Sequence, residues 1–455
     1  MSSKVTLVGA GLVGSLLSIF LAKKGHQVEV FERRPDYRKM GAVGGRSINL
    51  ALSERGWRAL KAAGIEQKIK DIALPMRGRM MHDIEGNLTF QPYGKENQAI
   101  YSVSRAILNE VLMDVAEKEQ NVKFHFNQRC ENIDIKDTEA TFLNEEEQTK
   151  NRVKSDIVIG ADGAFSAVRG ELQKMPLFNY TQHYLPHGYK ELTIPPNEDG
   201  SHKLAPDALH IWPRRSFMLI ALPNTDGSFT CTLFLRFESD KEHQEAFDKL
   251  TSDEEIISFF ETHFADVIPI MPTLLEDFKQ NPTSSLVTIR CAPWAYQGKV
   301  CLIGDASHAI VPFYGQGMNS GFEDCFYFNE FMEKQLKKNK NIDWQELFSD
   351  FQEERIPNTN AIADLAIQNF IEMRDRVADP EFLLRKKIEA KLHEQFPSRW
   401  IPQYTMVTFS HLPYSYALNT GKKQEQIMNE IMKKEDIENN WQNLDWESIV
   451  EQLQS

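Results

Sequence analysis

The start of the chain combines a short apolar strand, a glycine-rich turn and a helix, and this combination restricts the fold most. Residues 4–8 form the predicted strand, residues 15–24 the helix, and residues 27–31 a second strand that ends at Glu32. The turn between them reads Gly9-Ala-Gly11-Leu-Val13-Gly14. Such glycines permit a tight turn, close approach of a pyrophosphate and close helix packing, while the acid binds a ribose hydroxyl. The pattern predicts a dinucleotide-binding unit, and a glycine-rich turn without a ligand is the alternative.

Two later segments also lead from an apolar strand into a turn and a helix. Residues 157–160 run into Asp162-Gly163, and residues 300–303 run into Gly304-Asp305. A loop rich in proline and glycine follows the second segment, and a helix is predicted from about Met318. Such a loop brings backbone N–H groups and a helix N-terminus against an electron-rich ligand. The Gly-Asp motif is weak alone, but it gains weight from the glycine motif at the start of the chain, which is strong because it lies between a strand and a helix with an acid at the right distance.

The three motifs, in this order, resemble those of the FAD-dependent aromatic hydroxylases. An ordinary NAD dehydrogenase has the first motif and lacks the other two. The resemblance implies an α/β protein of the aromatic hydroxylase fold. Its parts would be a Rossmann-like FAD-binding domain, an antiparallel-sheet substrate domain and a C-terminal helical region.

The middle of the chain supports a second domain, because it alternates as strands do. Residues 209–213, 217–222 and 229–237 predict three antiparallel strands, with a hairpin turn at residues 224–227. From residue 323 onward the pattern is helical, with long charged faces. We therefore predict a discontinuous FAD-binding domain formed by residues 1–75, 100–180 and 285–330. Residues 76–99 and 181–284 would form the substrate domain, and residues 331–455 the helical region.

Composition excludes several other classes of protein. The 455 residues suffice for two or three domains, and the net charge of −13 argues against nucleic acid or an anionic membrane as partner. The five cysteines lack a CxxC pair, so neither a disulfide framework nor a zinc site is expected, and no metal is predicted. The first strand leaves no room for a signal peptide, and no apolar run approaches ~18 residues. We expect a cytoplasmic monomer or homodimer without a membrane anchor, whose polar tail packs on the body as a helix.

Motifs outside the nucleotide site sharpen the resemblance to the kynurenine 3-monooxygenase family. They span nearly the whole chain and lie at residues 45–53, 75–82, 92–94, 101–105, 312–319, 369–374 and 404–410. The tail departs from eukaryotic members, which carry a C-terminal membrane anchor, and resembles soluble bacterial members.

The family's substrate residues transfer by motif to Arg79, Tyr93, Asn369 and Tyr404. The resemblance implies that Arg79 holds the substrate carboxylate and that the other three donate or accept hydrogen bonds. The side chains suit these roles, since guanidinium grips a carboxylate with two bonds and phenols carry a donor on a rigid ring. Singly, Arg79 would be a surface ion pair, Tyr404 a packing residue and Asn369 a helix-surface residue.

The resemblance also assigns the cofactor-binding residues. Glu32 would bind the adenosine ribose with Arg34 nearby, Ala51 would lie beside the isoalloxazine, and Arg105 would reach the phosphates or ribose. Asp305 would bind the ribityl chain, and Met318 and Asn319 the ring edge. The remaining predicted contacts are Gly9, Gly11, Val13, Gly14, Asp162 and Gly317. Arg105 as a strand-end cation remains an alternative.

The implied reaction converts L-kynurenine to 3-hydroxykynurenine, with noncovalent FAD as cofactor and NADPH and O2 as co-substrates. No second glycine motif is evident, so NADPH is expected to bind transiently in a surface groove. The aniline nitrogen already activates the ring, so no dedicated base is expected. We favour a loop-stabilising role for His308 over that of a base, and Glu372 could be an inner acid or a helix-surface residue. The alternatives are a hydroxylase of another aromatic compound and a flavoprotein reductase or oxidase.

Overall fold

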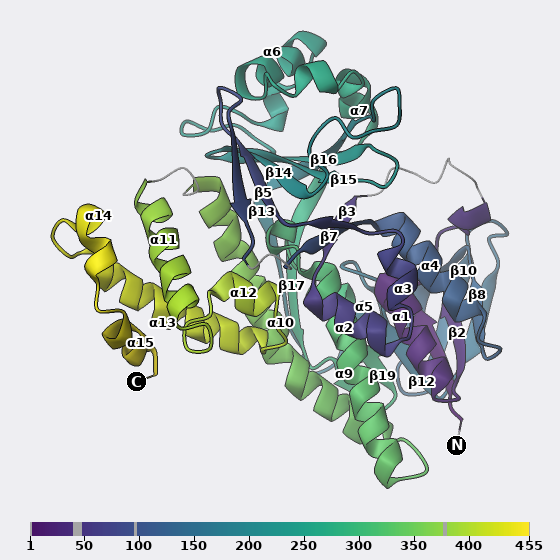
Figure 1. Cartoon of the computed structure of the whole chain (residues 1–455). Helices are drawn as coiled ribbons and strands as arrows, with labels where there is room; N and C mark the ends of the chain where they lie inside the picture. Colours follow the sequence, from purple (N-terminus) through teal and green to yellow (C-terminus); the bar gives the residue numbers. More distant parts are fainter. Residues whose placement is uncertain (1, 40–47, 95–97, 376–379, 455) are drawn as a thin grey trace.

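The structure is a computed structural model, and it describes residues 2–39, 48–94, 98–375 and 380–454. Residues 45–47 of the 45–53 motif therefore lie outside the described residues. Figure 1 shows the first nucleotide-binding elements on one side, a sheet capped by helices above them, and the C-terminal helices on the opposite side.

The first sheet carries the three nucleotide motifs. Among the described residues it contains six strands, in the order β18 (Ala295–Tyr296), β19 (Val300–Leu302), β12 (Ile157–Gly160), β1 (Lys4–Val8), β2 (Gln27–Phe31) and β8 (Val122–His125). All neighbours pair in parallel except β18 with β19. Parallel strands buried on both faces need continuous apolar residues, which is why these segments were recognisable. The strands predicted near residues 4, 27, 157 and 300 are confirmed.

Helices cover this sheet and begin close to where the sequence placed them. Helix α1 (Leu12–Lys23) starts three residues before the predicted bound, because Gly11 already stands at its N-cap. Helix α9 (Gly317–Lys338) starts one residue before Met318. Both helices pack together, with α4 (Arg105–Glu117) on the other side of α1 and α2 (Glu54–Ala62) against α9.

The second sheet contains the three predicted antiparallel strands. In the described chain its order is β17 (Ser284–Ala292), β13 (Asn179–Ile194), β16 (Phe229–Arg236), β15 (Phe217–Pro223), β14 (Ala208–Arg214), β5 (Gly78–His82) and β6 (Leu88–Pro92). β14, β15 and β16 pair antiparallel, and the Gly227 amide donates to the Asn224 carbonyl oxygen in the expected turn. Helices α6 (Asp253–His263) and α7 (Leu274–Gln280) cover one face, as Figure 1 shows.

Two further sheets of three strands each complete the described strands. The first short sheet contains β3 (Asn49–Leu52), β7 (Ile100–Ser104) and β4 (Leu74–Met76), and the second contains β9 (Gln128–Asp134), β10 (Glu139–Asn144) and β11 (Lys150–Lys154). β17 pairs with β13 from Asn179 onward, so this strand pair crosses the boundaries predicted near residues 181 and 285. Helix α9 likewise crosses the one predicted at residue 330. The domain division stays a proposal.

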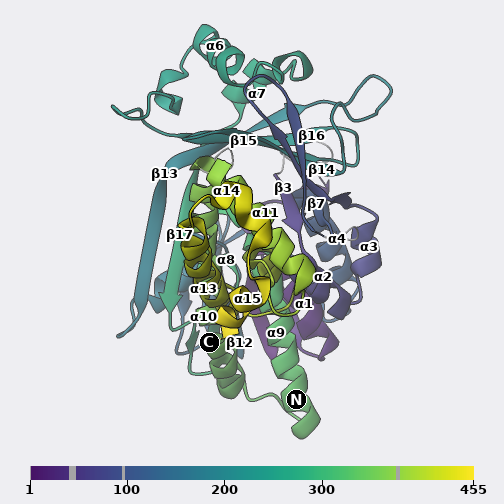
Figure 2. The same ribbon diagram turned by 60° about the vertical axis from the view of Figure 1, so that its left-hand side comes forward.

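The C-terminal part is helical, as predicted. It contains α10 (Trp344–Asp375), α11 (Pro380–Gln395), α12 (Gln403–Thr408), α13 (Tyr414–Met432), α14 (Ile437–Asn440) and α15 (Trp446–Gln454). The tail packs on α11 through a core that includes Ile388, Trp400, Ile431 and Val450, and Figure 2 shows these helices grouped together. No helix within the described ranges is long and apolar enough to cross a membrane. All five cysteines are unpaired, and four are buried.

Candidate active site

The three glycines of the first motif are required for different structural reasons. Gly9 has φ +102°, and a Cβ there would lie 2.5 Å from the Ala161 carbonyl oxygen. A Cβ on Gly14 would lie 2.0 Å from the Gly9 carbonyl oxygen. These two glycines are therefore needed by the packing of the turn itself. A Cβ on Gly11 would meet nothing within 4 Å, so the space above Gly11, at the N-terminus of α1, is open to a ligand.

Glu32 lies at the mouth of this turn, where β2 ends. Its Oε2 accepts from the Ala10 amide at 3.0 Å, and its Oε1 accepts from the Arg34 amide at 3.0 Å. The Arg34 side chain is exposed. A carboxylate held beside a helix N-terminus by backbone donors is the arrangement that binds a ribose hydroxyl in dinucleotide folds.

The second motif supports the third through hydrogen bonds. Asp162 accepts from the Ser166 hydroxyl at 2.6 Å and from the Ala167 amide at 2.7 Å, and so caps α5 (Ala167–Leu172). Burial raises the pKa of Asp162, although these hydrogen bonds oppose the shift. Arg169 then donates to the Ala306 carbonyl oxygen at 2.8 Å. The carboxylate of Asp162 thus serves the protein's own helix, which anchors the third motif.

Val13 brings the first motif and the third together. A Cβ on Gly304 would lie 3.0 Å from Val13, and one on Gly321 would lie 2.6 Å from it. Asp305, the first residue of α8 (Asp305–His308), is exposed beside this contact. The three motifs therefore converge on one site although they are far apart in the sequence.

Asn319 joins the start of α9 to strand β3. Its Nδ2 donates to the carbonyl oxygens of Ala51 and Gly315, both at 2.8 Å, and its Oδ1 accepts from the Ser53 amide at 2.9 Å. Gly317 and Met318 are half-buried in the first turn of the helix. The side chain of Asn319 thus fixes the turn, and α9 presents its N-terminus beside Ala51.

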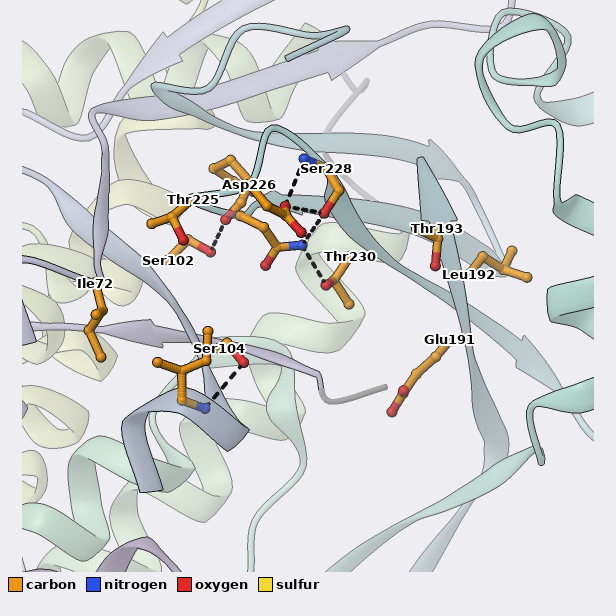
Figure 3. Close-up of a pocket in the computed structure, with 13 residues that line it drawn as sticks. Ile72, Ser102, Ser104, Glu191, Leu192, Thr193, Thr225, Asp226, Ser228 and Thr230 are labelled. Carbon is orange, nitrogen blue, oxygen red and sulfur yellow. Dashed lines mark hydrogen bonds between the residues drawn. The ribbon is translucent and has the colours of Figure 1, made fainter. Parts of the chain in front are cut away.

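Arg105 is exposed at the start of α4, next in sequence to Ser104, which lines a cavity of about 280 Å³. Burial raises the pKa of Glu191 in the cavity wall, and the charge of Arg105 opposes that shift. Figure 3 shows hydroxyl, amide and carboxylate groups around the cavity, contributed by β7, β13 and the β15–β16 hairpin. The described lining residues include no cation, so this cavity differs in charge from the site around Arg79.

Arg79, Tyr93 and Tyr404 form one cluster. Arg79 lies on β5, Tyr93 follows β6 and Tyr404 lies on α12. The guanidinium carbon lies 4.9 Å from the centre of the Tyr404 ring and 5.7 Å from that of Tyr93. The Tyr404 ring stacks on both Tyr93 and Tyr314, with centroids 5.6 and 5.5 Å apart. Three tyrosine rings and one cation therefore line a common site.

Two polar atoms of this cluster are buried without a hydrogen bond. Within the described chain, Arg79 Nε and Tyr93 Oη have no partner. Burial disfavours the charge of Arg79, but Tyr404, Tyr93 and Glu372 outweigh that effect and hold its pKa above the ordinary value. Burial also raises the pKa of Tyr93, which therefore stays a neutral phenol. Buried donors of this kind require a partner, and a ligand carboxylate would supply one.

Asn369 lies beside this cluster and contacts the loop before α9. Its Nδ2 donates to the Phe313 carbonyl oxygen at 2.7 Å, and the ring of Phe370 stacks on Phe313 with centroids 4.0 Å apart. Asn369 therefore holds the 3-10 turn η5 (Pro312–Tyr314), which carries Tyr314. Sequence reasoning missed Tyr314 itself, although the Pro-Phe-Tyr-Gly motif that contains it was recognised.

The two residues left open by the sequence have distinct surroundings. His308 Nε2 lies 2.5 Å from Asp324 Oδ2 in the interior, where it ties α8 to α9. This contact agrees with a loop-stabilising role. Glu372 is half-buried, and Lys386 Nζ lies 3.7 Å from its Oε1. Its carboxylate acts on the electrostatics of both Arg79 and Tyr314, so it belongs to the surroundings of the cluster.

Similarity to known proteins now decides the family. The model of an FAD binding domain matches residues 2–366. A kynurenine 3-monooxygenase of Christiangramia forsetii is 49% identical over 98% of this chain and 97% of its own length. The chain belongs to the kynurenine 3-monooxygenase family. A Flavobacterium johnsoniae member is 48% identical over 100% of this chain and 99% of its own, and a Sus scrofa member is 43% identical over 94% and 88%.

Solved structures establish the fold of this family member. A 2-methyl-3-hydroxypyridine-5-carboxylic acid oxygenase matches with a TM-score of 0.66 and 17% identity over 88% of this chain and 98% of its own. A p-nitrophenol 4-monooxygenase from Pseudomonas putida matches with a TM-score of 0.64 and 17% identity over 95% and 96%. At such low identity the likeness concerns the fold, which is that of the aromatic hydroxylases.

Proposed function

We propose that this protein is an FAD-dependent monooxygenase that converts L-kynurenine to 3-hydroxykynurenine with NADPH and O2, a step of tryptophan degradation. The observation that carries the proposal is the Arg79 cluster. It combines a half-buried cation, an unpartnered phenol and stacked rings, which suit the carboxylate and the aromatic ring of one small molecule.

The residues around the glycine turn fit FAD. Gly11 leaves room for a pyrophosphate, Val13 closes the base of the turn, and Glu32 stands where a ribose would bind. We propose that the predicted ligands hold FAD noncovalently, namely Gly9, Gly11, Val13, Gly14, Glu32, Arg34, Ala51, Arg105, Asp305, Gly317 and Met318, with Asp162 and Asn319 acting through the turns they fix. FAD, once reduced by NADPH, would supply the activation of O2.

The chain's own residues would bind, orient and exclude water. Arg79 would pair with the substrate carboxylate, and the Tyr93 hydroxyl would donate to it. Tyr314 and Tyr404 would pack against the aromatic ring, and Asn369 would keep Tyr314 in place. The apolar contacts of Met76, Ile100 and Leu222 exclude water nearby. The aniline nitrogen of kynurenine activates the adjacent ring carbon, so no protein base is required.

The test is to measure NADPH oxidation and product with the purified, FAD-loaded protein. We expect L-kynurenine to accelerate NADPH oxidation and 3-hydroxykynurenine to appear in mass spectrometry. Hydroxylation of another aromatic acid in preference to kynurenine would refute the substrate assignment. NADPH oxidation with no hydroxylated product from any aromatic acid would refute the reaction class.

We also propose that the protein is a cytoplasmic monomer or homodimer. The absence of paired cysteines among the described residues, with four thiols buried, suits a reducing compartment. Cell fractionation and light scattering measure the two properties.

A further inference from the structure

Arg55 connects two parts of the active site that are far apart in the sequence. It lies on α2, and the whole residue is 1% exposed. Its Nη1 donates to Glu323 Oε1 on α9 at 2.7 Å. Its Nε donates to the Val407 carbonyl oxygen at 2.8 Å, and its Nη2 donates to those of Met406, at 3.2 Å, and Leu412. One guanidinium thus holds both α9 and the segment around α12.

A second contact leads from Arg55 to the turn before α9. The guanidinium carbon lies 3.8 Å from the centre of the Tyr414 ring. The Tyr414 hydroxyl donates to Gln316 Oε1 at 2.9 Å. Gln316 stands at the N-cap of α9, directly before the predicted flavin contacts. Arg55 therefore contacts the start of α9 in two ways, through the Tyr414 ring to Gln316 and directly through the Glu323 carboxylate.

The carboxylates of α9 continue the connection to the third nucleotide motif. Arg355 donates to Glu323 Oε2 at 2.8 Å and to Asp324 Oδ1 at 2.7 Å. Asp324 Oδ2 accepts from the Gly304 amide at 3.1 Å. Burial alone would raise the pKa of Glu323, but the charges of Arg355, Arg55 and Arg58 outweigh it and hold the pKa below its usual value. Glu323 is thus a charged partner of Arg55 at neutral pH.

Tyr404 lies on α12, the helix whose carbonyl oxygens accept hydrogen bonds from Arg55. Helix α12 spans Gln403–Thr408, so the bonded carbonyls of Met406 and Val407 lie in the same short helix as Tyr404. A six-residue helix has few hydrogen bonds of its own and depends on such tertiary contacts for its position. A change in the position of α12 would therefore reach α9 through Arg55.

We propose that Arg55 is a positioning residue that couples the substrate-binding helix α12 to the flavin-facing end of α9. It is not among the residues predicted to bind substrate or flavin. It fixes the distance between Tyr404 and the flavin turn, so that kynurenine binding and productive use of NADPH depend on one another. This inference rests on the proposed function.

The experiment compares Arg55→Lys with Arg58→Lys. Lysine keeps the charge beside Glu323 but cannot make the parallel bonds of a planar fork. Arg58 is the matched control, since its Nη2 binds the same Glu323 oxygen at 2.8 Å and reaches none of the described α12 carbonyls. Both variants are loaded with FAD, and we measure the kynurenine KM and the fraction of NADPH recovered as hydroxylated product.

We expect Arg55→Lys to bind FAD like the wild type, to raise the KM ~10-fold and to divert most NADPH to hydrogen peroxide, because buried charge-assisted bonds are lost. Arg58→Lys should stay within about twofold of the wild type, because a lysine ammonium can keep the one bond that Arg58 makes to Glu323. Wild-type coupling in Arg55→Lys, or equal uncoupling in both variants, would overturn the proposal. If Arg55→Lys does not fold, Tyr414→Phe removes only the bond to Gln316 and should uncouple partially; full coupling in Tyr414→Phe would then overturn it.

Hydrogen exchange gives a readout that does not need turnover. In Arg55→Lys without kynurenine, amides of residues 403–412 should exchange faster, while the Arg58→Lys pattern should match the wild type. Unchanged exchange at residues 403–412 would contradict the proposed link. A wild-type protein that makes no 3-hydroxykynurenine would refute the proposed function instead, and the exchange comparison would still decide the role of Arg55.

Discussion

Replacement of Arg79 by alanine should weaken kynurenine binding strongly. The half-buried guanidinium lies beside the stacked Tyr93 and Tyr404 rings, and its Nε has no partner within the described chain. A carboxylate about 4 Å away in a site of intermediate polarity gains about 4 kcal/mol from this charge. Partial solvent exposure reduces that value, so we expect a loss of about 2–4 kcal/mol. This loss corresponds to an increase in KM of about 30- to 1,000-fold.

Arg79→Lys separates charge from geometry. The ammonium keeps the attraction for a carboxylate but loses the fork and the broad face that covers the Tyr404 ring. Loss of that face costs about 0.5–2 kcal/mol. We therefore expect Arg79→Lys to have a KM between those of the wild type and Arg79→Ala.

The assay combines steady-state KM values with equilibrium titration of flavin fluorescence. Kynurenamine, which lacks the carboxylate, is the control ligand and should bind wild type and Arg79→Ala with similar affinity. A near-normal kynurenine KM in Arg79→Ala would refute the reasoning. An equal loss for kynurenamine would show that the substitution damages the pocket rather than the ion pair.

Three further predictions follow from contacts in the nucleotide and substrate sites. Gly11→Val should fold normally yet lose FAD, because its side chain would fill the open space that the pyrophosphate needs, and a flavin-loaded variant in absorbance spectra would contradict this. Gly14→Ala should lose about 1–3 kcal/mol of unfolding free energy in urea, because its Cβ would meet the Gly9 carbonyl oxygen. Glu323→Gln should lose about 3–5 kcal/mol of unfolding free energy at pH 7. Folding lowers the pKa of Glu323, so its contribution to stability is present above the ordinary value of 4.5 and is lost as the pH falls further. The difference in unfolding free energy between Glu323→Gln and the wild type should therefore be smaller at pH 4 than at pH 7 in urea titrations. An equal difference at both pH values would be inconsistent with an ionised Glu323. Tyr404→Phe removes one hydroxyl and keeps the stacked ring, so it should leave the melting temperature unchanged. In stopped-flow measurements kynurenine should accelerate flavin reduction less in this variant, and the variant should release more peroxide. Flavin reduction that is equally fast with and without kynurenine in the wild type would exclude this control of reduction by the substrate.

Local patterns made much of the fold predictable from the sequence. A buried parallel strand must be apolar throughout, and a tight turn into a helix must contain glycine, so the strands before Gly9, Asp162 and Gly304 were recognisable one at a time. Alternating strands with a hairpin turn identified the centre of the second sheet. The pairing of β5 with β14 was not predictable, because it joins segments that no local pattern relates.

The candidate site was predictable only in part, because side-chain partners depend on tertiary contacts. Motif resemblance assigned Arg79, Tyr93 and Tyr404 to one substrate site, and the structure places their side chains in one cluster. Nothing local distinguishes Arg55 from any charged residue of an amphipathic helix, since its partners come from α9 and α12. Asn319 was expected at the flavin ring, yet its amide is occupied by backbone groups that only the folded turn supplies.

The contact of Val13 with Gly304 and Gly321 determines when the cofactor site can come into existence. During synthesis β1 and β2 leave the ribosome first, but the other neighbour of β1 is β12, and β19 follows only after residue 300. Parallel strands so far apart in the chain pair slowly, and their apolar edges stay exposed meanwhile. A nascent chain that ends before α9 would therefore offer the glycine turn without its far wall. Flavin capture is accordingly a late event in synthesis, because the site is complete only after Gly304 and Gly321 have emerged and packed on Val13.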